Sequence, residues 1–209
     1  MMDKLSVGQF REMLDAALAA VKEKADYFSQ LDAITGDGDH GTAIVAALNV
    51  AVLSSLAAPD FKGMFNDIGF GIMLNTSGST STLLGGFFLG MADGSAGLEV
   101  GAAQLKTMFS SGLEGVAKNT KAKVGDKTMM DALIPAVEAM VACDSGDIKE
   151  ILSAGAAAAN MGAEATTALK ANFGRARNYG ERSIGSKDAG ASSWATMFDA
   201  FSKHFNHKS

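Results

Sequence analysis

The sequence predicts an all-α protein. Only 2 of the 209 residues are proline, alanine-rich stretches recur along the chain, and 47% of the residues are hydrophobic. Alanine is the best helix former, and glycine, of which there are 24, lets neighbouring backbones approach closely. This composition favours closely packed helices, and the length fits a single domain that covers residues 1–209.

The N-terminal helix is predicted by its start signal and by its spacing. Ser6-Val7-Gly8-Gln9 has the form of a capping box, in which the serine and glutamine side chains each bond the other residue's backbone N–H group. Phe10, Leu14, Leu18 and Val21 follow at helical spacing, which gives the helix one apolar face. The sequence therefore predicts a helix from about residue 6 to residue 29.

Apolar stretches between polar or glycine-rich segments predict the remaining helices, for a total of about eight. They span residues 42–57, 60–74, 83–91, 98–117, 128–142, 147–172 and 192–204. Pro135 lies inside one of them and removes a backbone hydrogen bond there, so we expect that helix to bend. Between the last two, residues 173–191 carry three arginines and four glycines without clear periodicity. A loop of this length tends to be functional.

Composition also excludes several classes of function. A net charge of −5, from 18 basic and 23 acidic residues, lacks the excess of lysine and arginine that binding to duplex nucleic acid needs. Cys143 is the single cysteine, so no disulfide can form within the chain, which favours a reducing compartment. Residues 1–24 lack the apolar core of a signal peptide, and no uninterrupted apolar run reaches the ~18 residues of a membrane span. We expect a cytoplasmic protein with neither a membrane nor a nucleic-acid partner.

Three carboxylates lie close together in a loop that also contains glycine. Asp32, Asp37 and Asp39 precede the second predicted helix, and Gly36 and Gly38 permit tight turns between them. Like charges held this close repel each other, and a bound Mg²⁺ or Ca²⁺ ion, which prefers oxygen ligands, removes that repulsion. A solvated loop with Asp39 as a helix cap explains the same acids equally well. An EF-hand is excluded, because the twelfth position counted from Asp37 holds leucine where glutamate is required.

Two segments are suited to binding anions at the N-termini of helices. His40, Gly41 and Thr42 follow the acidic loop, and residues 76–82, a run of serine, threonine and glycine, precede the helix at 83–91. Unpaired N–H groups at a helix start attract phosphate, and hydroxyl groups add further donors. A metal site beside an anion site suggests a metal–nucleotide complex. The chain has neither a Walker-type nor a Rossmann glycine motif, so another scaffold would have to bind the nucleotide.

Three blocks, in the same order and at similar spacing, resemble the L subunit of dihydroxyacetone kinase. They are Asp32-Ala-Ile-Thr-Gly-Asp-Gly-Asp-His-Gly41, Gly125-Asp-Lys-Thr-Met129, and Gly174-Arg-Ala176 with Gly180-Glu-Arg-Ser-Ile-Gly185. The resemblance covers nearly the whole chain, which also has the length of a free-standing L subunit. It implies eight antiparallel helices that form a closed barrel, with a nucleotide site and a lid loop at one end. We call residues 173–191 the lid.

The resemblance also assigns roles to individual residues. It implies that Asp32, Asp37 and Asp39 bind two Mg²⁺ ions that hold the phosphates of ADP or ATP. Arg175, in the lid, would be the catalytic residue, because its planar fork can offset charge on the phosphates. The positions that match nucleotide contacts in the family are His40, Gly41, Thr42, Ala43, Ser79, Thr80, Gly125, Arg175, Asp188, Ala189 and Gly190.

The family implies an ADP/ATP-carrying subunit of a phosphotransferase-system-dependent kinase for dihydroxyacetone or a related short ketose. A phosphohistidine on a separate M subunit would recharge ADP, and the γ-phosphoryl group would pass to a ketose held on a K subunit. Positioning and charge neutralisation supply most of the catalysis in such transfers, so no protein nucleophile is needed. A homodimer is expected. Two alternatives stay open: a nucleotide-binding partner of a transcription regulator, and a subunit of a kinase that uses free ATP.

Some positions depart from the family pattern. Residues 77–85 read Ser-Gly-Ser-Thr-Ser-Thr-Leu-Leu-Gly, where the family usually has Gly-Gly-Ala-Ser-Gly-Pro-Leu-Tyr-Gly, so the segment keeps small residues but loses glycine and proline. Ala189 stands where proline is common, and Trp194 where a smaller apolar residue is expected. We expect Trp194 to pack at a helix start. These departures predict a divergent member that serves another short ketose.

Overall fold

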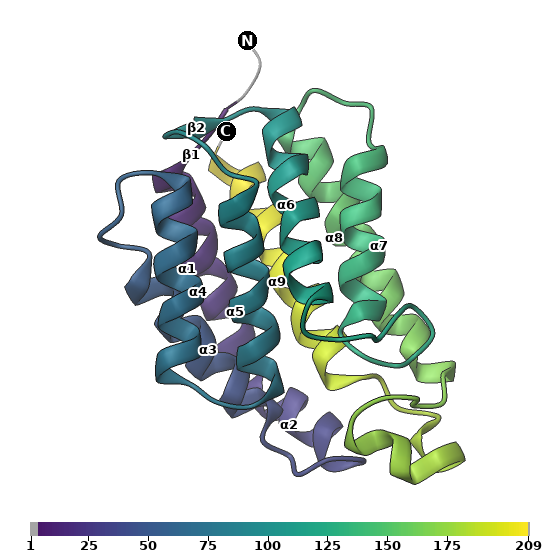
Figure 1. Ribbon diagram of the computed structural model, residues 1–209. Helices are drawn as coiled ribbons and strands as arrows, with labels where there is room; N and C mark the ends of the chain where they lie inside the picture. The colour runs from purple at the N-terminus through teal and green to yellow at the C-terminus, as the bar shows by residue number, and fades with distance from the viewer. Residues whose placement is uncertain (1–3, 209) are drawn as a thin grey trace.

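The computed structural model describes residues 4–208, which form α-helices joined by loops, together with two short strands (Figure 1). The prediction of an all-α protein is confirmed. The strands β1 (Leu5–Ser6) and β2 (Glu99–Val100) pair antiparallel. The α-helices are α1 (Val7–Glu23), α2 (Ala25–Ala33), α3 (His40–Ser54), α4 (Phe61–Asn75), α5 (Ser79–Asp93), α6 (Ala102–Ala117), α7 (Met130–Ala142), α8 (Ile148–Ala165) and α9 (Ala189–Lys208). Two 3₁₀ segments, η1 (Thr166–Ala168) and η2 (Arg175–Ser183), lie between α8 and α9.

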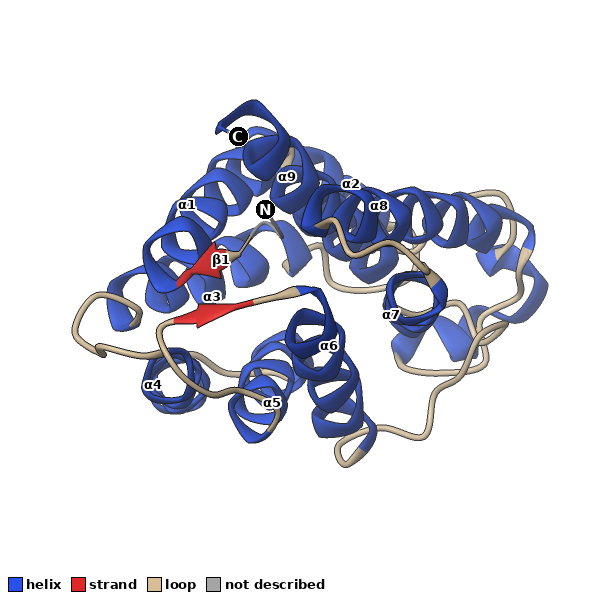
Figure 2. Cartoon of the chain, turned by 90° about the horizontal axis from the view of Figure 1, so that it is seen from above, coloured by secondary structure: helices blue, strands red, loops and turns tan. Residues whose placement is uncertain are grey.

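Eight of these helices close into a ring. Each packs along its neighbour in the order α1, α3, α4, α5, α6, α7, α8 and α9, and α9 packs back against α1. Consecutive helices of the ring run in opposite directions (Figure 1), and Figure 2, seen from above, shows α4 and α7 nearly end-on. The closed barrel of eight antiparallel helices is thus confirmed. The additional helix α2 crosses one end of the barrel.

Buried phenylalanines fill the interior of the barrel. Phe10 of α1 packs against Phe65 of α4, with ring centroids 5.0 Å apart, and against Phe201 of α9, with ring centroids 5.7 Å apart. Phe87 of α5 makes an edge-on contact with Phe109 of α6 at 5.9 Å. Such contacts join elements that are far apart in the sequence, and they favour a single arrangement of the rings. The core therefore holds the helices in place and leaves their loops free to build a site.

The helices α5 and α6 approach each other through glycine. A Cβ atom added at Gly90 would lie 2.2 Å from the carbonyl oxygen of Ser111, and one added at Gly115 would lie 2.2 Å from that of Gly86. Both distances are far below van der Waals contact, so even alanine does not fit. The many glycines of the sequence are used here for close helix packing, as expected.

The first helix differs from the prediction because it is broken. The capping box at Ser6 and Gln9 is present, but the chain bends at Lys24, whose N–H group bonds the carbonyl groups of Val21 and Lys22. The chain then continues as α2 to Ala33. Both segments have helical propensity, so the local sequence contains no signal for the bend. Its consequence is that Asp32 lies in the last turn of a helix, whereas the sequence placed it in a loop.

Other helix ends also differ from the predicted ones. The helix predicted over 147–172 ends at Ala165, because the following backbone finds partners elsewhere: Ala171 N–H donates to Ser183 Oγ and Asn172 N–H to the Asp126 carbonyl. The helix predicted from 98 begins at Ala102, after β2. The last helix begins at Ala189 instead of 192, so the final residues of the lid form its first turn. Pro135 lies inside α7.

Within the part of the chain that the structure describes, no helix is long and apolar enough to cross a membrane. We expect no signal peptide in residues 1–24, and residues 1–3 of this segment lie outside the described residues.

The contact between α5 and α6 gives a first prediction. Gly115→Ala should lower the free energy of unfolding by about 2 kcal/mol, because the added methyl group overpacks a backbone contact. Gly8→Ala, in α1, is the control, since its Cβ would meet nothing closer than 3.9 Å. Guanidinium unfolding followed by circular dichroism measures both. Equal stability of Gly115→Ala and the native chain would contradict the close packing of these helices.

Candidate functional site

The loops at one end of the barrel surround a cavity of about 440 Å³. This is within the size range of small-molecule sites in proteins. The lining comes from α2 and the acidic loop after it, from the start of α5, from the loop between α6 and α7, and from the lid. Segments that are distant in the sequence therefore meet here, as the chain reverses direction between antiparallel helices.

The structure brings the three predicted aspartates together. Asp32, Asp37 and Asp39 each present a carboxylate oxygen within 4.8 Å of the others. Asp32 Oδ2 accepts the N–H groups of Gly38 at 2.9 Å and of Asp39 at 3.1 Å, which curls the loop back onto α2. Gly38 adopts φ +78°, a conformation that favours glycine. One carboxylate thus folds the loop that carries the other two.

The charges of this cluster are incompletely balanced. Burial raises the pKa of Asp39, and the neighbouring carboxylates of Asp37 and Asp32 raise it further. The pKa of Asp37 is lowered, chiefly by a hydrogen bond from Arg175. A donor set made only of carboxylate oxygens, crowded and repelling, fits a hard divalent cation such as Mg²⁺ or Ca²⁺. Asp39 is the N-cap residue of α3, but its side chain makes no capping hydrogen bond, so the solvated-loop interpretation loses its helix cap.

Arg175 reaches the acidic loop from the lid. Its guanidinium forms an ion pair with the carboxylate of Asp37, and Asp37 raises the pKa of Arg175. Both side chains remain largely exposed, at 66% and 45% of their surface. The ion pair therefore holds the lid across the mouth of the cavity at an exposed point.

His40 connects three elements at the cavity wall. It is the first residue of α3, and its Nε2 lies 2.8 Å from Ser193 Oγ while its Nδ1 lies 3.3 Å from Thr80 Oγ1. Ser193 donates its own hydroxyl proton to the carbonyl of Gly190, so we assign the imidazole proton to Nε2 and the acceptor role to Nδ1. Burial lowers the pKa of His40, which favours this neutral ring. The ring thus ties α3 to α5 and α9.

Not all of the predicted site residues face the cavity. Among the described residues, its lining includes the three aspartates, His40, Ser79, Thr80, Arg175, Asp188, Ala189 and Gly190, but not Gly41, Thr42, Ala43 or Gly125. The N–H group of Gly41 donates to Ser29 Oγ, and a Cβ added there would lie 1.9 Å from the carbonyl oxygen of Ala25. Gly125 donates its N–H group to Asp131 Oδ1 at 2.6 Å. In this structure Gly41 serves the crossing of α2 and α3.

Apolar side chains also line the cavity. They include Leu83, Met129, Met130 and Trp194, and Trp194 packs edge-on against Phe87 with ring centroids 5.1 Å apart. Trp194 is 2% exposed, so its expected packing at a helix start is confirmed. Its place in the cavity lining was not predicted, because the local sequence does not reveal that Trp194 of α9 packs against α5. The cavity lining thus combines charged and apolar side chains.

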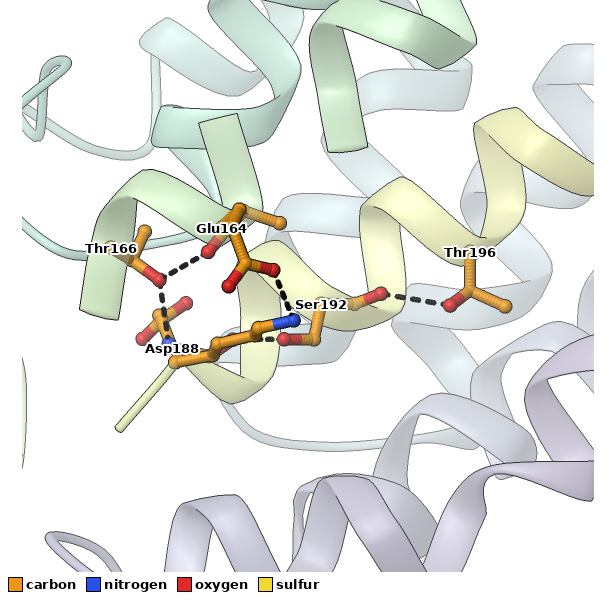
Figure 3. A network of polar contacts seen from close by, with 7 residues as sticks. Glu164, Thr166, Asp188, Ser192 and Thr196 are labelled. Atoms are coloured by element: carbon orange, nitrogen blue, oxygen red, sulfur yellow. Dashed lines mark hydrogen bonds and ion pairs between the residues drawn. The ribbon is translucent and has the colours of Figure 1, made fainter. Parts of the chain in front are cut away.

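Asp188 joins the lid to the barrel (Figure 3). Its N–H group donates to Thr166 Oγ1 at 2.9 Å, its carbonyl accepts the hydroxyl of Ser192, and its Oδ2 accepts the N–H group of Ala191 at 2.7 Å. The residue keeps some surface toward the cavity, but its carboxyl group is enclosed. Burial raises the pKa of Asp188 to about 7, against an opposing contribution from the Ala191 N–H group.

Comparisons with known proteins agree with this architecture. Residues 34–203 match the DAK2 domain. The chain is 35% identical over 195 residues to the ADP-binding subunit DhaL of PEP-dependent dihydroxyacetone kinase 2 from Listeria innocua, and the match covers 90% of both chains. It is 32% identical over 175 residues to the ADP-binding subunit DhaL of the PEP-dependent dihydroxyacetone kinase of Escherichia coli, covering 81% of this chain and 83% of the relative.

A solved structure shows the same helical fold. The crystal structure of the C. freundii dihydroxyacetone kinase in its native form is similar with a TM-score of 0.67 and 26% identity. The match covers 92% of this chain and 34% of the kinase, so the chain spans about a third of that protein's length. The same kinase in complex with AMP-PNP and Mg²⁺ matches with a TM-score of 0.69 and 24% identity.

The enclosed carboxyl group of Asp188 predicts a dependence of stability on pH. The folded group holds its proton up to about pH 7, whereas its ordinary pKa is 3.8, so its stabilising contribution is complete below 3.8 and declines as the pH rises to 7. In Asp188→Asn this decline should be absent. The native chain should therefore lose about 3 kcal/mol of unfolding free energy relative to the variant between pH 5 and pH 8.

Denaturant unfolding of the two proteins across this range measures the difference, with Asp15→Asn, an exposed position on α1, as the control. If the native and Asp188→Asn curves ran parallel with pH, the carboxyl group would not be the cause.

Proposed function

The chain belongs to the DAK2-domain family, and we propose from this premise that it is the nucleotide-carrying subunit of a kinase for dihydroxyacetone or a related short ketose. The observation that carries the proposal is a cavity with three convergent carboxylates on one wall and Arg175 across its mouth. The family relatives named above are ADP-binding subunits, which supports ADP or ATP as the ligand.

The apolar and charged parts of the cavity lining suit the two ends of a nucleotide. Leu83, Met129 and Trp194 offer apolar surface to a base, and the acidic loop, Arg175 and the start of α5 offer groups that bind metal ions or phosphate. Ser79 and Thr80 begin α5, whose N-terminus has no side-chain cap, so its first N–H groups are available to an anion. We infer that the phosphates lie between this helix start and the acidic loop.

Asp32, Asp37 and Asp39 would hold Mg²⁺, and we propose two ions because one nucleotide and three carboxylates bring many oxygen ligands into a small volume. Bound Mg²⁺ supplies neutralisation of phosphate charge. Asp32 also fixes the position of the loop through its two backbone hydrogen bonds. Arg175 lies where its fork can bond a phosphate oxygen once it leaves Asp37.

In the proposed phosphate relay, partner chains supply both the phosphate donor and the acceptor. His40 is half-buried and bonded at both ring nitrogens, which makes it a poor acceptor of a phosphoryl group. The bound nucleotide would instead receive phosphate from a phosphohistidine M subunit and pass it to a ketose on a K subunit. Such a relay operates in the cytoplasm. The part of this chain in the reaction is to position phosphates, balance their charge and close the lid over them.

Direct detection of the ligand tests the proposal. Native mass spectrometry of the purified protein should show bound ADP, and titration with ADP in the presence of Mg²⁺ should change the fluorescence of Trp194, the single tryptophan, which lines the cavity. Absence of nucleotide in both experiments would refute the proposal.

Reconstitution tests the relay separately. With ketose-binding and phosphohistidine subunits, phosphoenolpyruvate should support turnover with a catalytic amount of ADP. Turnover with free ATP alone, without a phosphohistidine subunit, would assign the chain to an ATP-using kinase instead.

Two aspartate variants should separate metal binding from loop folding. Asp37→Asn should weaken Mg²⁺-dependent ADP binding about 10-fold or more without lowering thermal stability, because it removes a ligand charge on an exposed side chain. Asp32→Asn should weaken binding and also cost about 1–2 kcal/mol of stability, because its carboxylate accepts two N–H groups.

Asp26→Asn, at an exposed position on α2, is the matched control and should change neither quantity. Calorimetric titration and thermal unfolding measure both effects. Native-like affinity in Asp37→Asn would mean that this carboxylate is not a metal ligand.

A further inference from the structure

Lys127 is a buried cation in a backbone conformation that disfavours it. Its side chain and backbone together are 4% exposed, and burial lowers its pKa. Its φ angle is +59°, in the left-handed region that is unfavourable for a residue other than glycine. The sequence thus tolerates two unfavourable features at one position, which indicates that the ammonium group has a specific task.

The ammonium group joins two separate segments. Lys127 Nζ donates to the carbonyl of Thr166 at 2.7 Å and to the carbonyl of Ser186 at 2.5 Å. Thr166 follows directly on α8, whereas Ser186 belongs to the end of the lid. Lys127 itself lies in the loop between α6 and α7 and contributes to the cavity wall. One side chain therefore fixes the lid to the barrel at the edge of the cavity.

We call residues 185–188 the lid root, because this short stretch makes the remaining bonds between the lid and the end of α8. Gly185 N–H donates to the carbonyl of Thr167 at 2.8 Å, and Asp188 N–H donates to Thr166 Oγ1 (Figure 3). Lys187 forms an ion pair with Glu164. Two lysines therefore bond at the lid root. The side chain of Lys187 is about one third exposed, whereas Lys127 is buried, so the hydrogen bonds of Lys127 are stronger than the ion pair of Lys187.

Two carboxylates fix the position of Lys127. Asp131 accepts the N–H groups of Gly125 at 2.6 Å and of Thr128 at 2.7 Å, which closes the loop around the lysine. The charge of Asp131 favours the ammonium form, and so does that of Asp188 once its carboxyl group is ionised. The lysine is therefore placed by its loop and attracted from the lid, and this arrangement can be lost only if the loop or the lid root moves.

We propose that Lys127 is a positioning residue that holds the lid root against α8 and so keeps the lid closed over the cavity. The inference concerns lid position, and it rests on the proposed function only for the identity of the ligand. Lys127 acts through the backbone of Ser186, with no part in the chemistry of phosphate transfer. Without its ammonium group the lid root should open more often, and a bound nucleotide should leave faster.

Two variants test this role. Lys127→Met keeps the apolar stem but removes the donor, and Lys127→Gly removes the side chain while relieving the left-handed backbone. Lys123→Met is the matched control, because Lys123 lies in the same loop with an exposed side chain. Amide hydrogen exchange of the nucleotide-free proteins, followed by mass spectrometry, measures opening of the lid root. The dissociation rate of fluorescent mant-ADP in Mg²⁺ measures release.

In both Lys127 variants, the amides of Gly185 and Asp188 should exchange about 10-fold faster or more, which is the loss expected for a bond from a charged donor. Amides of α1 and α4 should exchange at the native rate, and mant-ADP should dissociate about 10-fold faster. The control should match the native chain. Native exchange at the lid root in both variants would overturn the proposal. So would a uniform loss of protection over the whole chain in both, since it would assign Lys127 to core stability.

The exchange experiment needs no nucleotide. Failure of the native protein to bind ADP would therefore count against the proposed function, whereas the exchange pattern would still decide the role of Lys127.

Discussion

Carboxylates that accept backbone N–H groups determine the shape of the open end of the barrel. A loop between antiparallel helices cannot pair its own N–H groups as a helix does, and buried backbone donors need partners. Asp32 accepts two such groups in the acidic loop, Asp131 accepts two in the loop between α6 and α7, and Asp188 accepts one where the lid enters α9. Each of these side chains stabilises a loop that lines the cavity.

This solution gathers negative charge around the cavity. Besides the three loop-forming carboxylates, Asp37 and Asp39 lie at the cavity, and among the described residues the cationic side chains in its lining are Lys127, Arg175 and Lys187. Repulsion and burial show in the raised pKa values of Asp39 and Asp188. Phosphate groups would add to the repulsion, so the proposed anionic ligand would be favoured by cations bound together with it. A metal ion would thus compensate the negative charge that the folding of the loops concentrates here.

The features that depend on residues close together in the sequence were predicted correctly. The capping box at Ser6 and Gln9 forms as predicted, and so do the apolar faces that build the barrel. The convergence of the acidic residues followed from the short spacing of Asp32 to Asp39. The bend at Lys24 could not be predicted, because the segments on both sides of it have helical propensity. The end of α8 at Ala165 could not be predicted either, because tertiary hydrogen bonds compete there with helical ones. The hydrogen bonds of Lys127 could not be predicted for the same reason, since both acceptors lie in segments that are distant in the sequence.

The two ends of the lid are held by interactions of different strength. The lid root is bonded through buried groups of Lys127, Thr166 and Asp188, whereas the beginning of the lid is held by the exposed ion pair between Arg175 and Asp37. Exposed ion pairs contribute little to stability, so the beginning of the lid can rearrange while the lid root stays in place. Asp37 cannot fully serve both Arg175 and a metal ion. Once its carboxylate coordinates a cation, the guanidinium needs another anion, and the phosphates of a bound nucleotide are the nearest that the cavity would supply.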